Sequence, residues 1–150
     1  MAEEILRAVF GAFFGAVGFA MLVHVPRRSW LPSGAIAAFS YLVYWAFLRI
    51  GLSDPTAIFL GSFLGSLVGQ FSARRMKIIG TVFLMSVVIP VVPGLGLYRM
   101  MSFWGQSRIA EGANMGIQAM ITIAMIALGL GAGAMIDRML HSGSRQIHHV

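Results

Sequence analysis

Apolar residues come in five long runs that are separated by short polar or basic stretches. The runs cover residues 8–23, 31–48, 56–73, 78–98 and 113–136. Each run is close to the ~20 residues that an α-helix needs to cross the hydrocarbon core of a bilayer. The pattern therefore predicts an all-α integral membrane protein with five transmembrane helices. It predicts a single transmembrane domain over residues 1–150, with no soluble domain.

The fourth run is unusual because it contains the segment Pro90-Val91-Val92-Pro93-Gly94. Proline has no amide hydrogen and clashes with the preceding helical turn, so it interrupts the hydrogen bonds that a helix keeps in lipid. We expect the fourth helix to be broken at Pro90–Gly94. Carbonyls around Ser86 and Val87 should be freed before the break, and amides should be unpaired where a helix resumes at Gly94. At ~1.5 Å per residue from Ile78, the break lies about 18 Å into a core of ~30 Å, near or just past its middle.

A broken helix near the membrane centre is a common substrate site in secondary transporters, where the positive end of a half-helix attracts anionic groups. The alternative is a proline kink whose backbone groups are satisfied by neighbouring helices. Nearby polar side chains could line a polar cavity or form hydrogen bonds between helices. The candidate substrate-binding residues are Ser86, Pro90, Pro93, Gly94, Gly96, Tyr98, Asn114 and Gln118.

Small residues recur at helical spacing in several runs. Gly61, Gly65 and Gly69 follow one another every four residues, and Gly11 and Gly15 repeat the spacing in the first run. Such a strip lets the backbone of another helix approach closely. We expect these glycines to be helix-packing positions. The packing would take place within this chain or, alternatively, against a partner chain.

The composition supports a membrane protein and argues against several other classes. Hydrophobic residues make up 58% of the chain, charged residues 11%, and cysteine is absent. The sequence contains no zinc-protease motif, nucleophile elbow or phosphate-binding loop, and it has few carboxylates for acid–base chemistry. We therefore expect no catalytic residue, metal site or cofactor. The net charge of +6 reflects basic residues at the ends of apolar runs, which does not suggest a nucleic-acid partner.

Basic residues are distributed unequally between the two sides of the predicted helices. One side carries Arg27, Arg28, Arg74, Arg75, Lys77, Arg138 and Arg145, and the other carries Arg7, Arg49, Arg99 and Arg108. Because the side richer in Lys and Arg is normally cytoplasmic, the N-terminus is expected outside and the C-terminus inside.

Asp54-Pro55 stands where the third helix should begin. Aspartate before proline in a first turn is a common helix-capping pattern, which we favour over a proton-carrying role. No other carboxylate lies within a predicted span. A group that couples transport to protons is therefore expected on a partner.

Two motifs resemble the threonine/serine exporter family. Val88-Ile89-Pro90-Val91-Val92-Pro93-Gly94, followed by Tyr98, Met100 and Met101, is similar to the proline–glycine signature of the second membrane half. The segments Gly18-Phe19-Ala20-Met21 and Val25-Pro26-Arg27 resemble the opening of the small subunit in two-component versions. The number and spacing of the runs also match.

The resemblance implies a five-span subunit in an inner membrane, working with a larger subunit that supplies five more spans and a soluble cytoplasmic part. It implies export of threonine and serine, or in some split pairs of small dicarboxylates such as succinate, driven by an ion gradient. A homo-oligomer is the alternative assembly. The alternative functions are a scaffold subunit that carries no substrate and a homo-oligomeric channel.

Overall fold

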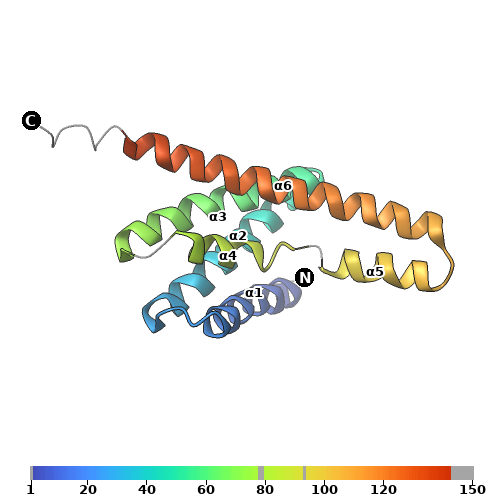
Figure 1. Ribbon diagram of the computed structural model, residues 1–150, viewed down its shortest axis with the longest axis horizontal. Coiled ribbons are helices and arrows are strands. Elements are labelled where there is room, and N and C mark those ends of the chain that lie inside the picture. Colours follow the sequence, from blue (N-terminus) through green and yellow to red (C-terminus); the bar gives the residue numbers. More distant parts are fainter. Residues whose placement is uncertain (1, 78–79, 93, 143–150) are drawn as a thin grey trace, which may run out of the picture.

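The computed structural model describes residues 2–77, 80–92 and 94–142. Within these ranges the chain is all-helical and contains no β-strand (Figure 1). The helices are α1 (Ala2–Leu22), the short 3-10 helix η1 (Arg27–Ser29), α2 (Trp30–Arg49), α3 (Asp54–Met76), α4 (Thr81–Val88), α5 (Gly94–Gly105) and α6 (Ile109–Ser142).

Four helical stretches in the described ranges are long and apolar enough to cross a membrane. They are Glu3–Leu22, Arg27–Arg49, Asp54–Met76 and Ile109–Leu140. The run predicted as the fourth span, 78–98, instead forms two shorter helices of 8 and 12 residues, α4 and α5. The predicted interruption is confirmed, because α4 ends at Val88 and α5 begins at Gly94.

Several helices continue beyond the apolar runs that predict them. α1 starts six residues before position 8, and its first turn holds an exposed ion pair between Glu3 and Arg7. α6 has 34 residues, whereas the apolar run covers 113–136. At ~1.5 Å per residue this helix is about 51 Å long, which exceeds a hydrocarbon core of ~30 Å. Polar residues can extend a helix because the backbone hydrogen bonds do not depend on apolar side chains.

α3 lies at the centre of a bundle that α2, α4 and α6 surround (Figure 1). Gly61 of α3 faces Ser40 and Tyr44 of α2, and Gly69 faces Phe83 of α4. Because Gly65, between them, faces Ser40 of α2 and Val87 of α4, both α2 and α4 are antiparallel to α3. α6 is parallel to α3, because Gly129 and Gly133 of α6 face residues 59–63 and 63–66 in the same order. α1 completes the bundle by packing mainly on α2.

α5 and the first turns of α6 form a hairpin that extends away from the rest of the bundle (Figure 1). Trp104 of α5 lies against Gly112, and Met100 lies against Gly116, so the two helices run antiparallel. α5 contributes no buried residue. The hairpin is therefore packed on one side only within this chain.

The interior is built from small residues. Buried serines and alanines dominate the described core, where Ser40 donates a 3.0 Å hydrogen bond to the carbonyl of Gly61 and Ser66 donates one of 3.2 Å to that of Leu130. A methyl group at Gly65 would lie 2.8 Å from Cγ1 of Val87. Close backbone approach and hydrogen bonds between helices are the expected sources of association in a bilayer.

The glycines proposed for packing fall into two groups. Gly61, Gly65 and Gly69 are buried and face α2 or α4, where a methyl group on each would meet atoms at 3.3 Å or less. In α1, a methyl group on Gly11 would meet nothing within 4 Å, and one on Gly15 would meet only Ile89, at 3.9 Å. α1 uses Ala16 and Ala20 as buried positions instead. The face of α1 that carries Gly11 therefore remains open in this chain.

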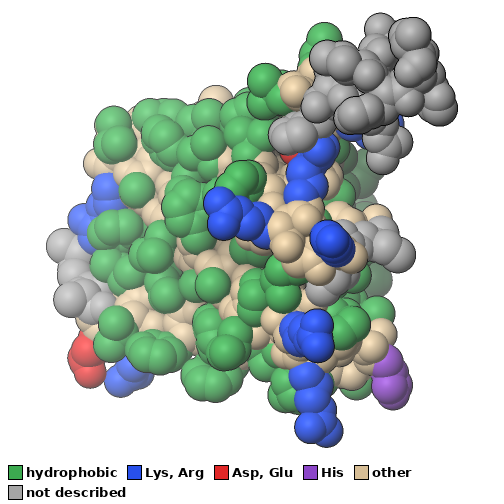
Figure 2. All heavy atoms as spheres, turned by 90° about the vertical axis from the view of Figure 1, so that its left-hand side faces the viewer, with side chains coloured by type: hydrophobic (Ala, Val, Ile, Leu, Met, Phe, Trp, Pro, Cys, Tyr) green, Lys and Arg blue, Asp and Glu red, His purple; other side chains and the backbone are tan. Residues whose placement is uncertain are grey.

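Lys and Arg side chains gather at one end of the bundle, surrounded by hydrophobic side chains (Figure 2). At this end, η1 and the last turn of α3 each contribute two arginines. Arg74 of α3 binds Asp137 of α6 through its Nε atom, at 3.1 Å from Oδ2, and through Nη2. The ion pair ties the ends of these two parallel helices together.

Candidate functional site

The break between α4 and α5 begins where two carbonyls of α4 lose their helical hydrogen bonds. Pro90 has no amide hydrogen to offer the carbonyl of Ser86. The amide of Val91 donates to Val88, at 3.0 Å, instead of to Val87. The carbonyls of Ser86 and Val87 therefore lack their helical donors, as the sequence predicts. The expectation of an unpaired amide at Gly94 is wrong, because this amide donates to the carbonyl of Val92 at 2.8 Å.

The break lies closer to one end of α3 than the sequence count suggested. Val91 packs with Ile58, one helical turn after α3 begins at Asp54. The middle of α3 is near residue 65, which faces Val87 instead. The reason is that α4 starts well inside the bundle, since Gly80 already lies beside Gln70, more than one turn before α3 ends. Counting from Ile78 therefore does not give the position of the break along α3.

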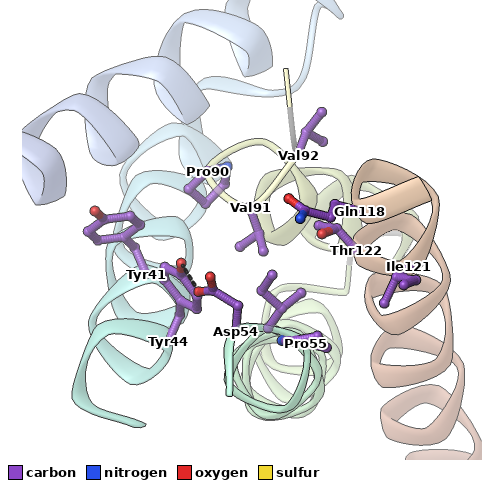
Figure 3. A pocket seen from close by; sticks show the side chains of 11 residues that line it. Tyr41, Tyr44, Asp54, Pro55, Pro90, Val91, Val92, Gln118, Ile121 and Thr122 are labelled. Atoms are coloured by element: carbon purple, nitrogen blue, oxygen red, sulfur yellow. Dashed lines mark hydrogen bonds between the residues drawn. The ribbon is translucent and has the colours of Figure 1, made fainter. Parts of the chain in front are cut away.

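A cavity of about 620 Å³ opens beside the break. It lies where the last turns of α2, the start of α3, the break and the middle of α6 meet (Figure 3). The lining residues are Tyr41, Tyr44, Asp54, Pro55, Ile58, Pro90, Val91, Val92, Gln118, Ile121 and Thr122. The volume is within the range of typical small-molecule sites.

One wall of the cavity carries a carboxylate and two phenols. The hydroxyl of Tyr44 donates a 3.2 Å hydrogen bond to Oδ1 of Asp54. The ring of Tyr41 lies 5.9 Å from that of Tyr44, measured between centroids. The short loop between α2 and α3 brings these residues together. The capping role expected for Asp54 is not observed: Ser53 is the N-cap residue, Asp54 is the first residue of α3, and its described partner is Tyr44.

The opposite wall is supplied by α6. The amide of Gln118 and the hydroxyl of Thr122 lie across the cavity from Asp54 and Tyr44 (Figure 3). These two residues are four positions apart, so they share a face of the helix. Val91 and Val92, from the break, lie between the two walls. The cavity thus has a negatively charged side and a neutral, hydrogen-bonding side.

Of the eight candidate substrate-binding residues, Pro90 and Gln118 line the cavity. Ser86 is buried, and its hydroxyl donates to the carbonyl of Val82 in its own helix. The remaining described candidates, Gly94, Gly96, Tyr98 and Asn114, are outside the lining, and Pro93 lies outside the described residues. The Tyr98 side chain is 69% exposed on α5. Sharing a helix face with Gln118 therefore does not bring Asn114 into the cavity.

The sequence interpretation placed Asp54 at a helix cap, so its position in a cavity beside Tyr44 was missed. A signal was present, since Tyr44 lies near the end of α2 and Asp54 begins α3 directly after the short loop of residues 50–53 between these antiparallel helices. Residues on either side of such a loop must be close in space. In the described part of the chain, no group of three or more His, Cys, Asp or Glu side chains is placed to hold a metal ion.

Comparison with known proteins adds one decisive finding. A model of the family described as "Threonine/Serine exporter, ThrE" matches residues 8–136. The chain belongs to the threonine/serine exporter family. The match covers α1 to α4, the break, α5 and most of α6, so the cavity lies entirely inside it. Searches of curated proteins and of solved structures gave no match.

Membership of the threonine/serine exporter family agrees with the apolar helices. Together they indicate a multi-pass membrane protein that takes part in transport. The resemblance of this chain to the threonine/serine exporter family is thereby confirmed.

Proposed function

We propose that this chain is a five-span subunit of a secondary exporter that moves threonine, serine or similar small amino acids through the cavity beside the α4–α5 break. The observation that carries the proposal is the meeting of a broken helix, a carboxylate and neutral hydrogen-bonding groups around a cavity of about 620 Å³. This combination is typical of transporter sites, where irregular backbone lines a polar cavity.

The fifth crossing would consist of α4, the break and α5 taken together. α4 is antiparallel to α3, α5 is antiparallel to α6, and α3 and α6 are parallel. α4 and α5 therefore run in the same direction, and residues 81–105 have the length of a span. This span would be shifted toward the outer side relative to α3, because the break already lies beside Ile58, one turn after α3 begins. The basic end of the bundle would lie on the cytoplasmic side of the inner membrane. The N-terminus is then outside, and the cavity opens near the outer ends of α2 and α3.

The working unit would pair this chain with a larger five-span subunit of the same family. The support is the α5–α6 hairpin, which projects from the bundle and exposes Leu95, Tyr98 and Met101 of α5. Another membrane subunit can pack on this apolar surface, whereas a homo-oligomer would have to bring two identical hairpins together. Co-purification with the larger subunit would support this pairing. A stable assembly of this chain alone would favour the homo-oligomer.

The proposal is tested by filling the cavity. Thr122→Trp places an indole among the lining residues, and Ile123→Trp places the same group at the next position of α6, outside the lining. In cells loaded with labelled threonine, Thr122→Trp should reduce efflux to background while Ile123→Trp retains it. Membrane levels of both variants are measured alongside. Normal efflux with Thr122→Trp would contradict the proposed pathway and favour a scaffold role.

A homo-oligomeric channel predicts a different result in purified liposomes. This chain alone would then release threonine without a partner and without an ion gradient. The proposed exporter requires both.

A further inference from the structure

Asp54 supplies the only formal charge among the described residues that line the cavity. We propose that Asp54 binds the ammonium group of the substrate, so that the exporter selects amino acids and rejects dicarboxylates. The inference rests on the proposed function and deepens it, because it assigns a substrate class to the same cavity. It also decides between the two substrate classes that the family resemblance leaves open.

Asp54 differs from other carboxylates of the chain in its partners. Glu3, Glu111 and Asp137 each form an ion pair with an arginine. The described partner of Asp54 is the hydroxyl of Tyr44, a neutral donor. An ionised carboxylate can accept several hydrogen bonds, so Asp54 keeps acceptor capacity that faces the cavity. Its negative charge is not offset by a cation from the described lining.

The opposite wall fits the other end of an amino acid. Gln118 has an amide group and Thr122 a hydroxyl, and both can donate hydrogen bonds to a carboxylate. An amino acid can thus lie across the cavity with its ammonium at Asp54 and its carboxylate at α6. A dicarboxylate of similar length would place its second negative group against Asp54, where like charges repel and neither has a compensating cation.

The test compares threonine with 3-hydroxybutyrate, which is threonine without its amino group, in equilibrium binding to the purified full chain in nanodiscs. Wild type should bind threonine more tightly than 3-hydroxybutyrate. Asp54→Asn should weaken threonine binding about tenfold or more, the typical value of a charge-assisted hydrogen bond, and leave 3-hydroxybutyrate nearly unchanged. Glu111→Gln is the matched control, because it removes a carboxylate that is paired with Arg108 outside the cavity.

A preference for threonine that persists in Asp54→Asn would overturn the ammonium role while leaving the proposed export function intact. Equal weakening of threonine and 3-hydroxybutyrate binding would assign Asp54 a structural role. That result would also overturn the ammonium role. If Asp54→Asn keeps its threonine affinity but its export no longer depends on a proton gradient, Asp54 is a proton carrier and the inference fails. Tighter binding of succinate than of threonine by wild type also overturns it. A wild-type chain that binds none of these ligands would overturn the inference, whereas the proposed export function is tested separately by efflux from cells that contain the partner.

Discussion

At the scale of single residues, glycines allow close contacts between the described helices. A methyl group on Gly129 of α6 would lie 2.7 Å from the carbonyl oxygen of Phe59 and 3.1 Å from the amide nitrogen of Phe63. Both atoms belong to the backbone of α3, which cannot rotate away as a side chain can. Two positions further on, a methyl group on Gly131 would meet nothing within 4 Å.

Gly129→Ala should therefore destabilise the protein by about 1–3 kcal/mol, the usual cost of overpacking a tight contact. Gly131→Ala should be neutral or slightly stabilising, because alanine is the better helix former. Unfolding in mixed detergent micelles measures both free energies on the same helix. Equal stability of the two variants would show that α3 and α6 do not touch at Gly129.

The site also shows what local sequence can predict about a residue. The pattern Asp-Pro predicts the beginning of α3 correctly, and Pro55 does lie in the first turn. It does not predict that Ser53 becomes the N-cap or that Asp54 meets Tyr44 from the preceding helix. The contact between Asp54 and Tyr44 depends on how α2 and α3 pack. The glycine face of α3 determines that packing, and the capping motif does not. Gln118 and Pro90 were correctly predicted near the site because each is an unusual residue within its own apolar run.

At the scale of elements, the break is what keeps Val91 and Val92 in the cavity wall. Pro90→Leu would restore an amide that can donate to the carbonyl of Ser86, so α4 could continue as a regular helix. The backbone of Val91 and Val92 would then be displaced from the lining. We expect threonine export to fall about tenfold or more, since small misplacements at a site have effects of that size, while the chain still reaches the membrane.

The matched control for Pro90→Leu is Pro32→Leu. Pro32 lies in the first turn of α2, where amides have no helical acceptor and proline costs little. Pro32→Leu should leave export close to wild type. Undiminished export in Pro90→Leu would mean that transport does not need the interruption.

The extents of the helices were predictable to different degrees. The apolar runs located α2 within one residue at each end, because Arg49 and a loop that contains Gly51 follow directly. They underestimated the length of α6. This helix includes Glu111, which pairs with Arg108, near its start and Asp137, which pairs with Arg74, near its end. The separation of α4 from α5 follows from two prolines. The projecting hairpin could not be predicted from the sequence. The residues of α5 do not show that this helix packs only on α6 and leaves the rest of the bundle.

At the scale of the whole molecule, the concentration of basic residues at one end implies a fixed orientation. Because the chain has no cysteine, single cysteines can report on it directly. A cysteine replacing Gln106, between α5 and α6, should react with a membrane-impermeant maleimide in intact cells. One replacing Arg28, between α1 and α2, should react only after permeabilisation. The reverse pattern would invert the orientation and place the cavity mouth on the cytoplasmic side.

The parallel pairing of α3 and α6 also bears on how the chain is made. Ser66 finds its partner, the carbonyl of Leu130, only after 64 further residues have been synthesised. At about 5–20 residues per second, the ribosome needs about 3 to 13 s to supply them. During that interval the face of α3 that carries Ser62 and Ser66, and that later receives Gly129 and Gly133, has no helix of this chain to cover it. Newly inserted α3 is therefore open to wrong pairing with other membrane segments until translation reaches the end of α6.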